Sequence, residues 1–82
     1  MATIEKLYLS ILSGMQDKNI KFRDLQKLLN ILGFECRIKG DHFIYSYSNL
    51  PENINIQPSG NMAKPYQVKQ IRTFLQKYQL KL

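Results

Sequence analysis

His42 is the only histidine in this 82-residue chain, and it follows Gly40 and Asp41 at the start of a strand-like run. An imidazole changes its charge near neutral pH, so it can take up or release a proton under physiological conditions. RNA carries its own nucleophile, the 2′-hydroxyl, which a histidine can deprotonate while Lys and Arg side chains stabilise charge on the phosphate. His42 is therefore a candidate general acid/base for RNA cleavage; the alternative is a surface or structural histidine without chemistry.

Cys36 is the only cysteine, so the chain has no internal disulfide and no CxxC redox or metal motif. One histidine and one cysteine do not make a zinc site of familiar spacing. We therefore expect no metal and no cofactor. Cys36 itself is interpreted as a small core residue.

Positive charge is in excess, with twelve Lys and Arg against six Asp and Glu, a net charge of +6. Such an excess on a small chain favours an anionic partner, although many small soluble domains are basic without a specific reason. The candidate RNA contacts are Lys39, Lys64, Lys69 and Arg72. Lys69 and Arg72, at i and i+3, form either a phosphate-binding stripe or a solvated helix face.

Two helices are predicted in the first part of the chain. Apolar residues recur with helical spacing over 4–12, with Thr3 as a candidate N-cap and Gly14 as a candidate stop. A second helix is predicted over 23–32. Gly33 should end it in a Schellman motif.

The period then changes from helical to alternating, which is typical of strands. Gly40 and Asp41 form a candidate two-residue hairpin turn between two strands. The remaining predicted elements are strands over 34–39, 42–47 and 54–57, a loop over 59–64, and a last helix opened by Pro65.

The turn fixes a register, because a two-residue loop pairs the residues on either side of it. The expected pairs are Lys39 with His42, Ile38 with Phe43, Arg37 with Ile44, and Cys36 with Tyr45. Opposed residues share a face of the sheet. One face is then a predicted core face of Phe34, Cys36, Ile38, Phe43, Tyr45 and Tyr47, and the other carries Arg37, Lys39, His42 and Ile44.

The element order predicts an α+β fold, with a three-stranded antiparallel sheet covered by helices on one face and open on the other. The chain has room for one domain, residues 1–82. It contains no apolar run of the roughly 20 residues that a membrane span needs, and its N-terminus does not read as a signal peptide. We therefore expect a cytoplasmic protein with no membrane partner.

From Asp17 to the end, about four-fifths of the chain, the sequence resembles the HicA family, the toxins of bacterial HicA–HicB toxin–antitoxin pairs. Residues 1–16 are then an N-terminal helical extension and 17–82 the family core. The matching segments are 19–22, 28–29, 32–34, the Gly40-x-His42 turn, 54–58 and, as the most specific, Ala63-Lys64-Pro65-Tyr66-Gln67-Val68-Lys69-Gln70-Ile71-Arg72.

The resemblance implies a fold like that of double-stranded-RNA-binding domains, αβββα, and cleavage of mRNA by a metal-independent endoribonuclease. It also implies neutralisation by a HicB-like antitoxin that covers the active face. The family's catalytic histidine, usually in Gly-Ser-His-His, carries over to His42. Here Asp41 replaces the serine and Phe43 the second histidine.

These observations lead to the interpretation of a HicA-like ribonuclease toxin, with the turn at Gly40 and Asp41 supporting the site. Two alternatives remain open. One is a non-catalytic RNA-binding module of the same fold, and the other is a protein-interaction domain whose basic face binds an acidic partner. An Asp41 carboxylate in contact with the imidazole would favour these alternatives.

Overall fold

The computed structural model describes residues 3–82, so the first two residues of the predicted extension lie outside it. The predicted α+β class is confirmed, with a three-stranded antiparallel sheet in the order β1-β2-β3. The elements are α1 (Ile4–Ser13), a short 3-10 helix η1 (Asp17–Asn19), α2 (Phe22–Leu32), β1 (Glu35–Lys39), β2 (His42–Ser46), β3 (Ile54–Ile56), β4 (Pro58–Ser59), β5 (Met62–Ala63) and α3 (Pro65–Lys77).

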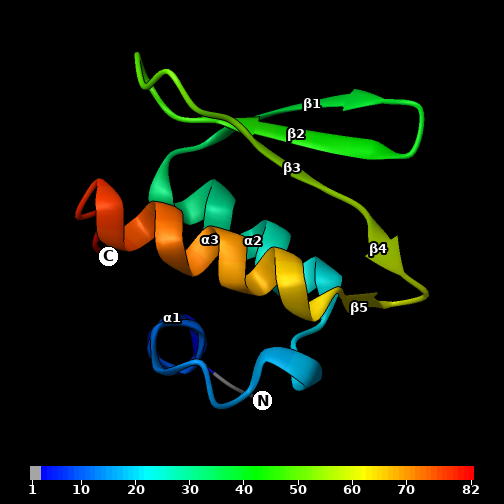
Figure 1. Cartoon of the computed structure of the whole chain (residues 1–82), viewed down its shortest axis with the longest axis vertical. Coiled ribbons are helices and arrows are strands. Elements are labelled where there is room, and N and C mark those ends of the chain that lie inside the picture. The colour runs from blue at the N-terminus through cyan, green and yellow to red at the C-terminus, as the bar shows by residue number, and fades with distance from the viewer. Residues whose placement is uncertain (1–2) are drawn as a thin grey trace.

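The helices all lie on one side of the sheet, but in two layers (Figure 1). α2 and α3 lie next to the sheet, and α1 packs against both of them on the side away from it. Ile11 of α1 is fully buried there. α1 is therefore a third layer of the fold, and it leaves the outer face of the sheet open.

The predicted N-cap of α1 and both predicted glycine stops are confirmed. Thr3 caps α1 by accepting a hydrogen bond from the Lys6 backbone N–H, and Gly14 follows in the left-handed conformation. At the end of α2 the N–H of Phe34 donates to the Leu29 carbonyl. The N–H of Gly33 donates to the Asn30 carbonyl, which completes a Schellman motif.

The predicted hairpin register is confirmed at every pair, from Lys39 with His42 to Cys36 with Tyr45. Gly40 has φ of 63°, and Asp41 next to it does not have a positive φ. This is the pattern of a type II′ turn, in which glycine is favoured at the first central position. The turn therefore places His42 at the first position of β2.

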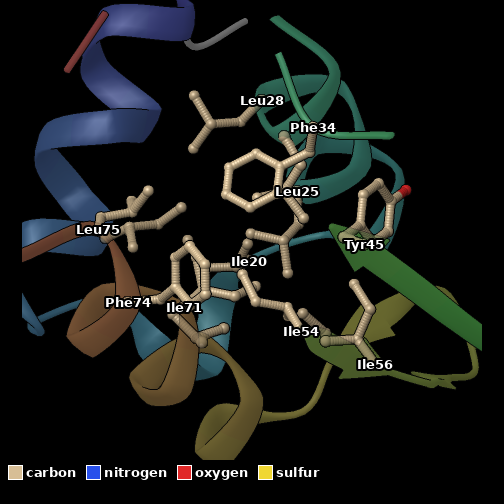
Figure 2. Close-up of a cluster of buried hydrophobic side chains, with 14 of the residues drawn as sticks. Ile20, Leu25, Leu28, Phe34, Tyr45, Ile54, Ile56, Ile71, Phe74 and Leu75 are labelled. Atoms are coloured by element: carbon tan, nitrogen blue, oxygen red, sulfur yellow. The ribbon is translucent and has the colours of Figure 1, made fainter. Parts of the chain in front are cut away.

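The core lies between the sheet and the two central helices (Figure 2). Tyr45 and the isoleucines Ile54 and Ile56 project from β2 and β3 toward leucines and aromatic rings of α2 and α3. Burial raises the pKa of Tyr45 to about 12, with Cys36 beside it adding to the effect. The buried face of the sheet is thus formed mainly by β2 and β3.

The predicted core face was wrong for β1. All five residues of this strand are exposed, including Cys36 and Ile38. β1 is an edge strand, and the buried sheet residues that pack against the two central helices come from β2 and β3. Alternation placed these residues on the correct face, but the sequence does not show how far the helices extend beneath that face.

The predicted loop over 59–64 was also wrong in part, because β4 and β5 form a small hairpin across Gly60. The N–H of Ala63 donates to the carbonyl of Ile20 at 2.8 Å, and the N–H of Phe22 donates to the carbonyl of Asn61 at 3.0 Å. The hairpin therefore ties the end of the sheet to the start of α2, and it leads directly into α3.

Candidate nucleic-acid interface and histidine site

His42 lies on the open face of the sheet, where the register predicted it, and its side chain is 47% exposed. It stands directly across from Lys39 of β1. The next pair in the hairpin places Ile38 opposite Phe43 on the helix side, so the alternation keeps Lys39 and His42 facing away from the core.

Two amide side chains from β3 and its end hold the imidazole. Nδ1 of His42 lies 3.1 Å from Oδ1 of Asn55, and Nε2 lies 3.3 Å from Nε2 of Gln57. β3 pairs Ile44 with Asn55, so Asn55 is the diagonal neighbour of His42, and Gln57 comes opposite His42 when the register is continued. The histidine is therefore positioned through both of its ring nitrogens.

Neither Asn55 nor Gln57 was predicted as a site residue. A signal for them is present in Ile54-Asn55-Ile56-Gln57, where two fully buried isoleucines alternate with two amides. This alternation sends both amides to the open face. The sequence did not show the register of β3 on β2, which is what brings the amides to His42.

Lys64 is the N-cap residue of α3, and its side chain reaches the amide cluster around His42. Its Nζ donates to Oε1 of Gln57 at 3.5 Å. The backbone N–H of Gln57 donates to Oε1 of the buried Gln67 at 3.1 Å, which anchors the start of α3 to the end of the sheet. Lys64 is thus close to His42 through one intervening side chain.

Asp41 is close to the imidazole but not in hydrogen-bond contact with it. Its Oδ1 lies 3.7 Å from Nε2 of His42, and its side chain is 81% exposed. A carboxylate so open to water interacts weakly with a neighbouring charge. Gly40 and Asp41 therefore support the site mainly by forming the turn that precedes His42.

Lys69 lies farther along α3, in a groove of about 340 Å³ between this helix and the segment before β3. The groove is also lined by Asn53 and by Tyr66, which is 64% exposed. At the other end of the groove Lys77 donates to Glu52, so this positive charge is paired. Lys69 and Tyr66 therefore form a basic and aromatic wall on the helix that Lys64 begins.

Arg72 does not lie with His42 and Lys64 or in the groove beside Lys69. Its Nη1 donates to Asp17 at 2.9 Å and 3.2 Å and to the carbonyl of Ile11 at 3.0 Å. Only 17% of the Arg72 side chain and 20% of the Asp17 side chain are exposed. The structure therefore places Arg72 in a partly buried ion pair between α3, α1 and η1, and not in a phosphate-binding stripe with Lys69.

Within residues 3–82 no three His, Cys, Asp or Glu side chains gather as a metal site would require. Over the same residues no helix has the length and apolar character to cross a membrane. Comparisons of the chain with protein-family models, with curated proteins and with solved structures gave no match.

Proposed function

We propose that this protein is an endoribonuclease that cleaves mRNA, with His42 as the general acid/base. The observation that carries the proposal is the setting of the imidazole. It is half exposed on an open sheet face, oriented by Asn55 and Gln57, and flanked by Lys39 and Lys64. A positioned imidazole beside cations is what the attack of a 2′-hydroxyl on its neighbouring phosphate needs.

In this reaction His42 takes the proton of the 2′-hydroxyl as the oxygen attacks phosphorus. The bond from phosphorus to the 5′-oxygen of the next nucleotide breaks, and the imidazole returns its proton to that oxygen. Lys39 and Lys64 stabilise the negative charge that develops on the phosphate. The products are a 2′,3′-cyclic phosphate and a 5′-hydroxyl end, and every step uses groups of the chain and of RNA.

The groove along α3 supports a single-stranded substrate. Aromatic side chains stack on unpaired bases of any sequence, and lysines contact the phosphates between them. Tyr66 and Lys69 supply one of each on the helix that Lys64 begins. We propose that RNA bound at His42 continues past Lys64 to this wall.

The resemblance to the HicA family supports a biological role for such an activity. We propose that the protein is the toxin of a toxin–antitoxin pair, acts on mRNA in the cytoplasm, and is neutralised by a HicB-like antitoxin. The open, basic sheet face is a surface that an inhibitory protein with acidic groups can cover.

A non-catalytic RNA-binding module is the second candidate, and the position of Asp41 favours it. A carboxylate 3.7 Å from the imidazole places negative charge where the reacting phosphate must sit. If the wild type does cleave RNA and Asp41 only repels the phosphate, Asp41→Ser should raise the cleavage rate roughly fivefold, equivalent to about 1 kcal/mol, whereas no activity in either protein favours the non-catalytic module. A slower Asp41→Ser variant would instead make Asp41 a partner of His42.

The proposal is tested by incubating a long transcript with the purified protein and with His42→Ala, with and without chelator. We expect cleavage by the wild type in both conditions, ends with a cyclic phosphate, and no cleavage by the variant. Thermal melts should agree within about 0.5 kcal/mol, because His42 is half exposed. Equal cleavage by both proteins would remove His42 from the reaction, and RNA binding without cleavage by either would favour the second candidate.

A further inference from the structure

In the contact between Lys64 and Gln57, only Lys64 can be the hydrogen-bond donor. An ammonium group has three donors and no acceptor, so it must face the oxygen of an amide and not its nitrogen. Nζ of Lys64 lies 3.5 Å from Oε1 of Gln57, in agreement with this requirement. Lys64 therefore orients the Gln57 amide so that its NH₂ group points the other way, toward the imidazole.

The orientation of the Gln57 amide determines which nitrogen of His42 accepts a hydrogen bond. Nε2 of Gln57 lies 3.3 Å from Nε2 of the imidazole, and an amide nitrogen can only donate. Nε2 of His42 must then accept, so it carries a lone pair and no proton. A neutral imidazole has one N–H, which is left on Nδ1, and Nδ1 faces the acceptor Oδ1 of Asn55 at 3.1 Å.

We propose that Lys64, acting through Gln57, sets the tautomer of His42, so that the neutral imidazole carries its proton on Nδ1. Lys64, Gln57 and Asn55 are then positioning residues. If the proposed ribonuclease function is correct, Nε2 is the atom that accepts the 2′-hydroxyl proton, and the Gln57 amide occupies the place that this hydroxyl takes. The tautomer itself does not depend on that function.

One neighbouring group favours the other tautomer of His42. The Asp41 carboxylate, 3.7 Å from Nε2, favours a proton on Nε2. Its side chain is largely exposed and the distance exceeds that of a hydrogen bond, so water weakens its influence. Lys39, across from His42, has no hydrogen bond to the ring among residues 3–82, and it adds positive charge without a preference between the two nitrogens.

The test is the ¹⁵N spectrum of the imidazole in purified protein without RNA, at a pH where the ring is neutral. Because His42 is the only histidine of the chain, its two nitrogens can be assigned without ambiguity. We expect the proton mostly on Nδ1 in the wild type and in Lys64→Arg, since a guanidinium also only donates. In Lys64→Met we expect a shift toward the Nε2–H form that imidazole prefers in water.

Two further variants separate the effect of the hydrogen-bond donor that faces Nε2 from the effect of a lost positive charge. Gln57→Glu replaces the donor facing Nε2 by an acceptor, so the proton should move mostly to Nε2. Lys69→Met removes the same charge from another position of α3 and should leave the wild-type tautomer unchanged.

A wild-type protein with its proton mostly on Nε2 would overturn the inference. So would a tautomer that responds to Lys69→Met as it does to Lys64→Met, because charge alone would then explain it. If the spectra are as expected but the protein does not cleave RNA, the tautomer is established and the ribonuclease proposal is rejected. The two proposals can therefore fail separately.

Discussion

The two sides of α3 use positive charge in different ways. On one side Lys64 donates to a side-chain amide at 3.5 Å, next to the half-exposed His42. On the other side Arg72 forms short bonds with Asp17 and with the carbonyl of Ile11, and little of its side chain reaches water. The first cation can contact a new anion, whereas the second already has one.

This difference shows what a net charge of +6 can and cannot indicate. A cation contributes to binding only where it is open to the ligand, and a partly buried ion pair contributes to the fold instead. Lys69 and Arg72 are three residues apart on α3 and looked equivalent in the sequence. The acidic partner of Arg72 lies 55 positions earlier, and no local pattern connects the two.

The largest expected effect is the loss of stability on removing the ion pair between Arg72 and Asp17. Arg72→Met should lower the free energy of unfolding by about 2 to 3 kcal/mol, because it leaves a partly buried carboxylate and a carbonyl without their donor. Lys64→Met, the matched change on the site side, should alter it by less than about 0.5 kcal/mol. Urea unfolding of both variants measures this. An equal decrease in both variants would mean that the two sides do not differ in stability.

A smaller effect is expected from two glycines that both have positive φ. A Cβ at Gly14 would lie 3.1 Å from Nη1 of Arg72, whereas a Cβ at Gly40 would meet no atom within 4 Å. Gly40→Ala should therefore cost about 1 kcal/mol for the backbone alone, and Gly14→Ala about 2 kcal/mol, as it also disturbs the ion pair. Thermal melts compare the two. A Gly14→Ala variant no less stable than Gly40→Ala would show that the guanidinium moves aside freely.

The smallest effect concerns the salt dependence of RNA binding, which depends on the proposed function. Removing one cation that binds a phosphate of single-stranded RNA should reduce the slope of log K against log salt by roughly 0.7. We expect this reduction for Lys64→Met and for Lys69→Met, and no change for Arg72→Met at a temperature where it is folded. Titrations at several salt concentrations give the slopes. A reduced slope for Arg72→Met would mean that its ion pair opens on binding RNA.

Local patterns predicted the scaffold of the site well. The change from helical to alternating spacing, together with Gly40, was enough to predict the pairing of Lys39 with His42 and the face on which His42 lies. Both features depend on neighbours in sequence, which is why they could be predicted without a structure. The glycine stops at Gly14 and Gly33 are of the same kind.

The features that could not be predicted depend on how distant segments meet. Asn55 and Gln57 reach His42 through the register of β3 on β2, across a connection whose length does not fix that register. The exposure of Cys36 depends on where α2 and α3 end beneath the sheet. In each case the residue pattern indicated the correct face, and tertiary packing decided what that face would contact.

The position of the C-terminal residues has a practical consequence for experiments on RNA. The last residues follow the end of α3 that is opposite its start at Pro65 (Figure 1), and the Tyr8 hydroxyl of α1 donates to the carbonyl of Leu80 there. Because α3 has 13 residues, a biotin or a tether attached to the last residues lies roughly 20 Å along the helix from Lys64 and the His42 site. A protein immobilised in this way presents its open sheet face to the solution, which suits surface-based measurements of RNA capture and release.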